Sequence, residues 1–352
     1  MNVLVLGGGQ QGRVIAADLA RSLPQARITV ADVREPRLSP ISNLRWLSAD
    51  CSDVTVVARL MSANDLAVGA LPSRFGFGVL QAAIEARRPL VDVSFCSENP
   101  LELDAAARAA GIPILPDCGL APGLSHLCCG QAAGQGSLDE LVIYVGGVAQ
   151  DATRPYGYVV TWSLDDLLEE YLRPARFVRD GRSVTLPVFS ELERIEVDGA
   201  GTMESFLSDG LRTLIDTLPE VPHMSERTLR WPGHVDAVRG LVESGAFLEE
   251  FRGKCLVDEP RDLVAMVVRA RWASGRSARM TLVDRWDDAS RLTAMSRTTA
   301  LTTSVTAQLV ARGGAREPGV HPLERVARDA DAYRFIVDEM ARRGVFMRWR
   351  DE

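Results

Sequence analysis

The sequence predicts an α/β protein in which a doubly wound parallel sheet is joined to an α+β domain. An apolar strand at residues 3–6 runs directly into a glycine-rich turn. Apolar strand patterns then alternate with helical patterns to about residue 120, which is the order of a parallel sheet with helices on both faces. Beyond about residue 138 the pattern changes to antiparallel strands interrupted by helices, which predicts a second domain with an open sheet.

The glycine-rich turn has the spacing of a dinucleotide-binding motif. Gly7, Gly9 and Gly12 follow the first strand as GxGxxG. In such a turn the first glycine reverses the chain, the second lets a pyrophosphate approach the backbone, and the third lets the helix pack closely on the strand. The helix expected over residues 11–23 offers free N–H groups to the phosphates, and Gln10 and Gln11 at its start are expected to contact the cofactor. We therefore expect a Rossmann domain at the amino terminus.

The expected cofactor is NAD. A second strand, residues 26–32, ends at Asp32, about twenty residues after Gly12 as the motif requires. A carboxylate there accepts hydrogen bonds from the ribose 2′-OH of NAD and repels the 2′-phosphate of NADP. Two alternatives remain open: Asp32 is a solvated strand end, or Arg34 holds a 2′-phosphate.

Later strand ends are expected at the same edge of the sheet, because ligands collect at the carboxyl ends of parallel strands. Further cofactor contacts are expected from Asp50, Leu71 and Pro72. Ser94 is the last residue of the strand expected at residues 89–94, and it is expected to contact substrate. Asp92 and Asp117 also end strands, where an aspartate either takes part in the chemistry or caps the following helix.

The chain is expected to divide into three parts. Residues 1–122 form the Rossmann domain, residues 123–298 the α+β domain, and residues 299–352 helices that return to the Rossmann domain.

Local patterns give four further expectations. Helices are expected over residues 163–172 and 203–218, and residues 278–286 are expected to form a hairpin with residues 291–299. Pro122 is expected in the first turn of a helix.

Composition excludes several classes of function. The chain has 46% apolar residues, 25% charged residues and a formal net charge of −7, so it has no basic footprint for nucleic acid or an anionic membrane. No apolar run is long enough for a membrane span and no signal-like leader is present, so a cytoplasmic location is expected. The six cysteines lack metal-binding spacing, so we expect no metal. Because Lys254 is the only lysine, arginine is expected to hold substrate carboxylates.

Several stretches resemble the saccharopine dehydrogenase-like oxidoreductases, and most closely their lysine 6-dehydrogenase branch. These stretches are, in order along nearly the whole chain, VDVS, AAGIPILPDCGLAPGLSHL, YVGG, SLDDLLEEY, SDGLRTL and TLRWPGH. The resemblance implies a Rossmann domain followed by an α+β substrate-binding domain, and a homodimer formed through the sheet of that second domain. In the saccharopine reductase branch an acid that helps bind substrate precedes the PG turn. Ala121 stands there in this chain, which argues against saccharopine as substrate.

The resemblance also points to residues of the substrate site. Arg230 of TLRWPGH matches an arginine expected to hold a substrate carboxylate, for which the two parallel N–H donors of a guanidinium are well suited. His234 follows the Pro-Gly turn and is a candidate catalytic residue. Weaker candidates for the pocket wall are Tyr156, Glu204 and Asp209.

The function implied is NAD-dependent oxidative deamination of the side-chain amine of L-lysine, or of a related diamino acid, to a semialdehyde that cyclises. The general base would be Asp117 or His234. Two alternatives remain open: reductive condensation of an amino acid with a carbonyl compound, as saccharopine reductase performs, and a non-catalytic NAD-binding protein.

Overall fold

The protein forms two compact units in a computed structural model that describes residues 1–38 and 40–352. The first unit comprises residues 1–130 and 299–344, and the second comprises residues 131–298 and 345–352.

The unit boundaries differ from the expected domain limits. They fall inside two helices, α5 (Leu124–Ala133) and α10 (Ala294–Ala311), and residue 122 lies within the first unit. Residues 345–352 group with the second unit because the chain ends in strand β16 (Arg348–Asp351), which pairs with β14 (Ser277–Arg285). A terminal edge strand of four residues carries too little periodicity to be recognised in the sequence.

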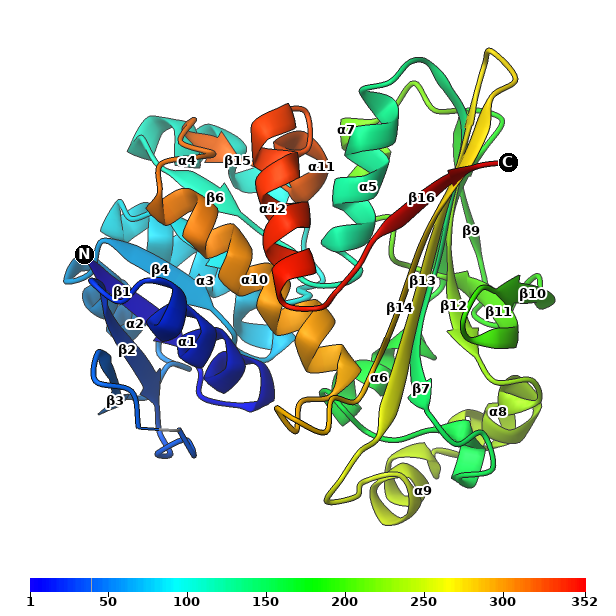
Figure 1. The fold of residues 1–352 in the computed structure, drawn as a ribbon, viewed down its shortest axis with the longest axis horizontal. Helices are drawn as coiled ribbons and strands as arrows, with labels where there is room; N and C mark the ends of the chain where they lie inside the picture. Colours follow the sequence, from blue (N-terminus) through cyan, green and yellow to red (C-terminus); the bar gives the residue numbers. More distant parts are fainter. Residues whose placement is uncertain (39) are drawn as a thin grey trace. The chain divides into compact units, whose positions relative to one another are not determined.

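A seven-stranded, all-parallel sheet forms the centre of the first unit (Figure 1). Its order is β15-β6-β5-β4-β1-β2-β3. The strands are β1 (Asn2–Leu6), β2 (Arg27–Asp32), β3 (Leu44–Ser48), β4 (Leu66–Gly69), β5 (Leu90–Asp92), β6 (Pro113–Leu115) and β15 (Gly319–Val320). The order reverses between β1 and β4, which creates the crevice at the carboxyl edge where doubly wound sheets bind ligands. The predicted α/β fold is confirmed.

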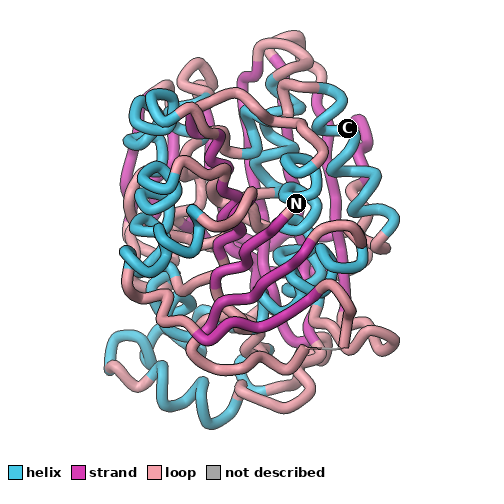
Figure 2. The backbone as a smooth tube through the Cα atoms, turned by 90° about the vertical axis from the view of Figure 1, so that its left-hand side faces the viewer, coloured by secondary structure: helices cyan, strands magenta, loops and turns pink. Residues whose placement is uncertain are grey.

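Helices cover both faces of this sheet (Figure 2). Besides part of α5 and of α10 they are α1 (Gln10–Ser22), α2 (Val54–Ser62), α3 (Ser73–Ala86), the 3-10 turn η1 (Pro100–Leu103), α4 (Asp104–Ala110), α11 (Leu323–Val326) and α12 (Ala330–Arg342). Asp18 of α1 joins three helices, because its carboxylate accepts hydrogen bonds from Ser304 and Gln308 of α10 and from Arg343 after α12. The segment 299–344 is thereby fixed to the amino-terminal sheet.

A nine-stranded mixed sheet forms the second unit, in the order β10-β11-β12-β7-β13-β14-β16 with β8 beside β12 and β9 beside β8. The remaining strands are β7 (Leu138–Ala149), β8 (Ala175–Arg179), β9 (Arg182–Leu186), β10 (Glu193–Val197), β11 (Gly201–Ser208), β12 (His223–Arg230) and β13 (Asp262–Trp272). All neighbours are antiparallel except β12 and β7. Its shorter elements are η2 (Pro155–Gly157), α6 (Leu164–Glu170), α7 (Leu214–Thr217), α8 (His234–Ser244) and α9 (Phe247–Lys254), and aromatic side chains form the core beneath them.

Two local predictions in the second unit were wrong. The expected helix over residues 203–218 is strand β11 followed by the short α7, because residues 204–208 pair with β12. The expected hairpin partner, residues 291–299, instead contains the start of α10. Both oxygens of the Asp262 carboxylate accept N–H groups of its first turn, from Ala294 at 2.7 Å and from Met295 at 2.9 Å. These caps and pairings come from distant parts of the chain.

The expected position of Pro122 was also wrong. Helix α5 begins at Leu124, so the proline precedes the helix and belongs to a tight turn. The Gly119 N–H donates to the Pro122 carbonyl at 3.1 Å, and a Cβ on Gly123 would lie 1.9 Å from the Gly119 oxygen. The turn is therefore too close for any residue but glycine at position 123.

Within the described residues, the structure contains no helix with both the length and the hydropathy that a bilayer span requires.

Candidate functional site

In the GxGxxG turn, the first and third glycines make the close backbone contacts that the motif predicts. Gly7 adopts φ +96° and donates its N–H to the Ala31 carbonyl at 2.8 Å. A Cβ on Gly12 would lie 1.9 Å from the Gly7 carbonyl oxygen, so only glycine allows α1 to approach β1 this closely. In contrast, a Cβ on Gly9 would meet nothing within 4 Å. The space beside Gly9 is the space that a pyrophosphate would need.

The amino end of α1 retains donors for such an anion. Gly9 is its N-cap, and no side chain of residues 1–38 or 40–352 makes a capping hydrogen bond there. These N–H groups therefore carry the partial positive charge of the helix terminus without an internal partner. Gln10 is exposed, whereas the Gln11 Oε1 atom is buried and has no hydrogen-bond partner among the described residues. The N–H donors of the helix terminus suit the phosphates of a dinucleotide.

Asp32 is held rigidly beside the same turn. Its Oδ2 accepts the Gly8 N–H at 2.7 Å and its Oδ1 accepts the Arg34 N–H at 2.9 Å. Each carboxylate oxygen has a second lone pair, so the group can still accept ribose hydroxyls. Its position fits the adenosine ribose of a dinucleotide.

The other expected cofactor residues lie at the carboxyl edge but have different surroundings. Asp50 accepts hydrogen bonds from the Ser52 N–H at 3.0 Å and from the Ser52 hydroxyl at 2.6 Å, and these bonds lower the pKa of Asp50. Its carboxylate therefore stabilises the turn after β3. Pro72 is the N-cap of α3, directly after Leu71. Ser94 is buried and donates its hydroxyl to the Leu71 carbonyl at 3.1 Å, so it joins the ends of β4 and β5.

Two buried aspartates lie at this edge as well. Asp92 accepts the Ser94 N–H at 2.7 Å through Oδ1, while its Oδ2 lies against Gly69 and has no hydrogen-bond partner among the described residues. Burial, with the Asp117 charge adding, raises the pKa of Asp92 to about 7. Asp117 is also buried and adopts the left-handed conformation, φ +55°, which is rare for a residue other than glycine. Strained backbone of this kind often marks a functional position.

A second polar cluster lies in the second unit, where β12 ends. Arg230 is almost fully buried, and each of its three guanidinium nitrogens donates a hydrogen bond within the protein. Nε donates to the Tyr171 hydroxyl at 2.8 Å, Nη1 to the Leu229 carbonyl at 2.8 Å, and Nη2 to Glu170 at 3.1 Å. The partner of this arginine is therefore a carboxylate of the protein.

His234 continues the same hydrogen-bond chain. Its Nδ1 lies 2.7 Å from the Tyr156 carbonyl, which can only accept, so Nδ1 carries the proton. Nε2 then accepts the Tyr171 hydroxyl at 2.8 Å. Burial, with the nearby Arg230 charge adding, lowers the pKa of His234 to about 3. Both nitrogens are occupied and the ring is neutral, which does not favour His234 as a general base.

The weaker candidates have structural partners. Glu204 accepts the Gly233 and Val235 N–H groups at 2.7 and 2.8 Å, so it caps α8 from the neighbouring strand β11. Asp209 accepts two hydrogen bonds from Arg176, at 2.7 and 3.1 Å. The Tyr156 hydroxyl donates to Glu250 at 2.9 Å, and the ring stacks on Phe251.

Three residues of the second unit were not predicted. Glu170 and Tyr171 complete the Arg230 cluster and lie in the quoted stretch SLDDLLEEY, about sixty positions earlier in the chain. Arg212 is a buried arginine with φ +48° in the stretch SDGLRTL. Arginine is almost never fully buried unless it is paired, and neither burial nor φ can be read from sequence spacing.

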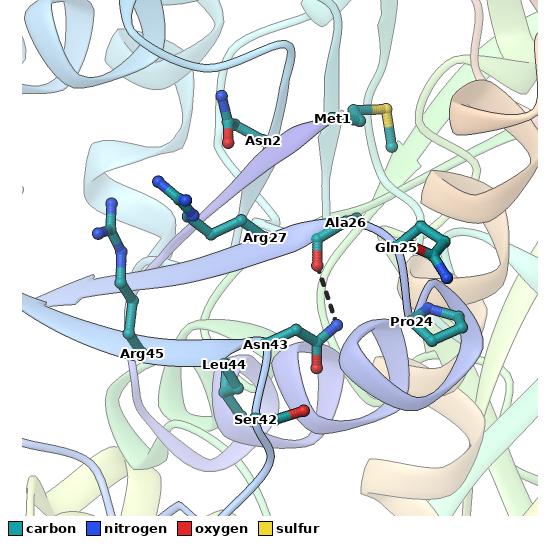
Figure 3. A pocket seen from close by; sticks show the side chains of 10 residues that line it. All are labelled: Met1, Asn2, Pro24, Gln25, Ala26, Arg27, Ser42, Asn43, Leu44 and Arg45. Atoms are coloured by element: carbon teal, nitrogen blue, oxygen red, sulfur yellow. Dashed lines mark hydrogen bonds between the residues drawn. The ribbon is translucent and has the colours of Figure 1, made fainter.

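A surface hollow of about 410 Å³ lies at the opposite edge of the parallel sheet, at the amino ends of β1, β2 and β3 (Figure 3). There the Asn43 side chain donates to the Ala26 carbonyl at 2.9 Å and also to the Ala20 and Leu23 carbonyls, so it caps the end of α1. The hollow is remote from the glycine-rich turn. Residues 1–38 and 40–352 contain no group of three His, Cys, Asp or Glu residues placed to hold a metal ion.

Comparison with known families covers both units. The model of the saccharopine dehydrogenase NADP binding domain matches residues 3–115, and that of the saccharopine dehydrogenase C-terminal domain matches residues 119–345. The chain is 26% identical over 264 residues to saccharopine dehydrogenase [NADP(+), L-glutamate-forming] of Saccharomyces cerevisiae, covering 71% of this chain and 59% of that protein. It is 25% identical over 163 residues to alpha-aminoadipic semialdehyde synthase of Arabidopsis thaliana, covering 44% of this chain and 15% of that protein. The chain thus spans about three-fifths of the yeast relative.

Two solved structures share the fold. Apo saccharopine dehydrogenase (L-Glu forming) from Saccharomyces cerevisiae superimposes with a TM-score of 0.76 at 19% identity, covering 100% of this chain and 99% of that one. Homospermidine synthase from Legionella pneumophila in complex with NAD superimposes with a TM-score of 0.70 at 12% identity, covering 99% and 91%. At these identities the likeness establishes the arrangement of the chain alone.

Proposed function

This chain belongs to the saccharopine dehydrogenase family, and from that premise we propose that it catalyses NAD-dependent oxidative deamination of the side-chain amine of L-lysine or a related diamino acid. The reaction would consume lysine, NAD⁺ and water. It would yield 2-aminoadipate 6-semialdehyde, which cyclises, together with NADH, ammonium and a proton.

The surroundings of Asp32 support the choice of NAD as cofactor. The carboxylate is fixed by two backbone N–H groups and keeps lone pairs for a ribose diol. A 2′-phosphate at that position would meet a negative charge that cannot turn away, which favours NAD over NADP. The Arg34 side chain is exposed and remains the feature that would favour NADP.

Bound NAD would supply the hydride acceptor. The protein must provide the substrate amine in its neutral form, because only a neutral amine can release a hydride from the adjacent carbon. With an ordinary amine pKa near 10.4, deprotonation at pH 7 costs roughly 4.6 kcal/mol. Loss of the hydride leaves an imine, water adds to it, and ammonia departs. Activity is therefore expected to rise toward alkaline pH.

We assign the general base to Asp117. The carboxylate is buried at the carboxyl edge of the parallel sheet, on strained backbone. His234, the other candidate, is neutral with both nitrogens engaged. The neighbouring Asp92, with its pKa raised to about 7, supplies a second carboxyl that can hold a proton at this edge.

The substrate is proposed to be smaller than saccharopine. Ala121 stands before the PG turn where a substrate-binding acid is expected for saccharopine, so one anchor for that larger molecule is lacking. The substrate carboxylate needs an arginine, and Arg230 and Arg212 are the two buried arginines of the quoted motifs.

A pair of assays tests the reaction class. NADH formation is followed with lysine, ornithine, diaminobutyrate or simple diamines as the sole substrate. NADPH consumption is followed with lysine plus an oxo acid or aldehyde. We expect NADH and ammonium in equal amounts from lysine or one of the diamino acids, and no carbonyl-dependent NADPH consumption.

Carbonyl-dependent NADPH consumption would instead assign the chain to reductive condensation of an amino acid with a carbonyl compound. NAD binding without turnover of any amine would leave a non-catalytic binding protein.

A further inference from the structure

The surface hollow at the amino edge of the parallel sheet has two arginines and no acidic residue among the described residues that line it (Figure 3). Its volume of about 410 Å³ is within the range of small-ligand sites. Arg27 at the start of β2 and Arg45 of β3 belong to the lining, and the other lining side chains are uncharged. All of these residues lie in the first unit. The hollow therefore carries a net positive charge.

The two guanidinium groups are held on the same side of the sheet. Strand β3 pairs with β2 so that Arg45 lies opposite Thr29, which is two residues from Arg27 and on the same face. The Arg45 Nε donates to the Thr29 hydroxyl at 3.0 Å, which directs the Arg45 side chain across β2. Figure 3 shows both arginine side chains extending in the same direction. From the usual spacing of strands and residues, their Cα atoms lie roughly 8 Å apart, so both side chains can reach one ligand.

No carboxylate neutralises this pair of arginines. Within residues 1–38 and 40–352 the Arg27 guanidinium makes no hydrogen bond or ion pair, and that of Arg45 makes only its bond to Thr29. Asp65 lies at the same edge, where its carboxylate accepts the Asn2 N–H at 2.7 Å. An anion between two adjacent guanidinium groups would replace their mutual repulsion with two attractive contacts.

The carbonyl groups at one wall of the hollow are already occupied. The Asn43 amide nitrogen donates to three carbonyls at the end of α1 and in the following turn, those of Ala20, Leu23 and Ala26. The last carbonyls of a helix carry a partial negative charge, which would repel an anion. Because Asn43 caps them, the negative potential on that side of the hollow is reduced.

We propose that this hollow binds a small polyanion with two phosphate groups, and that Arg27 and Arg45 each contact one of them. A guanidinium presents two parallel N–H donors that match the oxygens of a phosphate. The described residues that line the hollow include no aromatic side chain, so a base or another ring has no surface to stack on. The ligand is therefore recognised by its charge. The site is remote from the glycine-rich turn, and it does not depend on the reaction proposed above.

Pyrophosphate is the probe, because it is the smallest anion with two phosphate groups. It is titrated calorimetrically into the full chain saturated with NADH, so that the glycine-rich turn is already filled. The variants Arg27→Gln and Arg45→Gln each remove one positive charge from the hollow. The matched control, Arg59→Gln, removes one positive charge from an exposed position of α2 outside the hollow. The NADH affinity of each variant shows whether the first unit is folded.

We expect one pyrophosphate to bind per chain. Arg27→Gln and Arg45→Gln should each bind it about tenfold or more weakly, because each loses charge-assisted hydrogen bonds. Arg59→Gln should bind pyrophosphate like the unsubstituted protein, and all three variants should keep their NADH affinity. Orthophosphate has one phosphate group and should bind more weakly than pyrophosphate. Adenosine diphosphate should bind no more tightly.

Absence of pyrophosphate binding to the NADH-saturated protein would overturn the proposal, and so would binding that Arg27→Gln and Arg45→Gln leave unchanged. An equal loss of affinity in Arg59→Gln would show an effect of overall charge and would refute the site. Tighter binding of adenosine diphosphate than of pyrophosphate would contradict recognition by charge alone.

Discussion

At the scale of single residues, the clearest consequence of burial concerns His234. Burial lowers its pKa from an ordinary 6.5 to about 3. Below about pH 6.5 the unfolded chain takes up a proton that the folded chain does not bind, so folding is progressively disfavoured as pH falls toward 3. From pH 7 to pH 5 this one group should lower the free energy of unfolding by about 2 kcal/mol.

Urea titrations at several pH values measure this effect. The variant His234→Gln should lose stability more gradually than the unsubstituted protein between pH 7 and pH 5, because it has no group to protonate there. Parallel pH profiles for the two proteins would show that His234 is accessible to protons in the folded state. The comparison isolates His234 from the other titrating groups, which both proteins share.

The sequence predicts which residues of this cluster matter but not how they pair. Arg230 and His234 were recognised from one short motif. The carboxylate that occupies Arg230 lies sixty positions away on α6, and no local pattern relates the two. In the structure Arg230 donates hydrogen bonds to Tyr171, Leu229 and Glu170. The sequence motif alone does not predict these partners.

At the scale of elements, two glycines of the turn have different roles, so that one substitution tests the packing of α1 on β1 and another tests cofactor binding. Gly12→Ala would place a Cβ 1.9 Å from the Gly7 carbonyl oxygen, so backbone must shift and stability should fall by about 1–3 kcal/mol. Gly9→Ala meets nothing within 4 Å, and its φ of −68° suits alanine. This variant should keep the unfolding temperature and bind NAD at least about tenfold more weakly, because its methyl group lies where the pyrophosphate approaches.

Thermal unfolding and calorimetric titration with NAD distinguish the two variants. Undiminished NAD affinity in Gly9→Ala would exclude this turn as the phosphate site.

Elements whose ends depend on distant residues were the ones predicted wrongly. Helix α10 begins at Ala294 because Asp262, at the start of β13, accepts its first N–H groups. The segment 203–208 is a strand because β12 lies beside it. By contrast, the strand–turn–helix unit at residues 2–22 is specified by neighbouring residues and was predicted almost to its ends.

At the scale of the whole molecule, the order of strands in the first unit was predictable and the composition of the units was not. Repeated strand–helix alternation specifies a parallel sheet, and the observed order β3-β2-β1-β4-β5-β6 is the one that dinucleotide-binding halves produce. Strand β16 joins the second sheet only because the chain returns to it after α12. Family membership follows from matches that cover both units.

The most direct test of the proposed reaction is to follow the hydride. L-Lysine deuterated at C6 is incubated with NAD⁺ and the full-length chain, and the reduced cofactor is analysed by mass spectrometry. We predict that deuterium from C6 appears in the NADH and that deuterium placed at C2 does not. Transfer from C2, or reduced cofactor that carries no label from either position, would contradict oxidation at the side-chain amine.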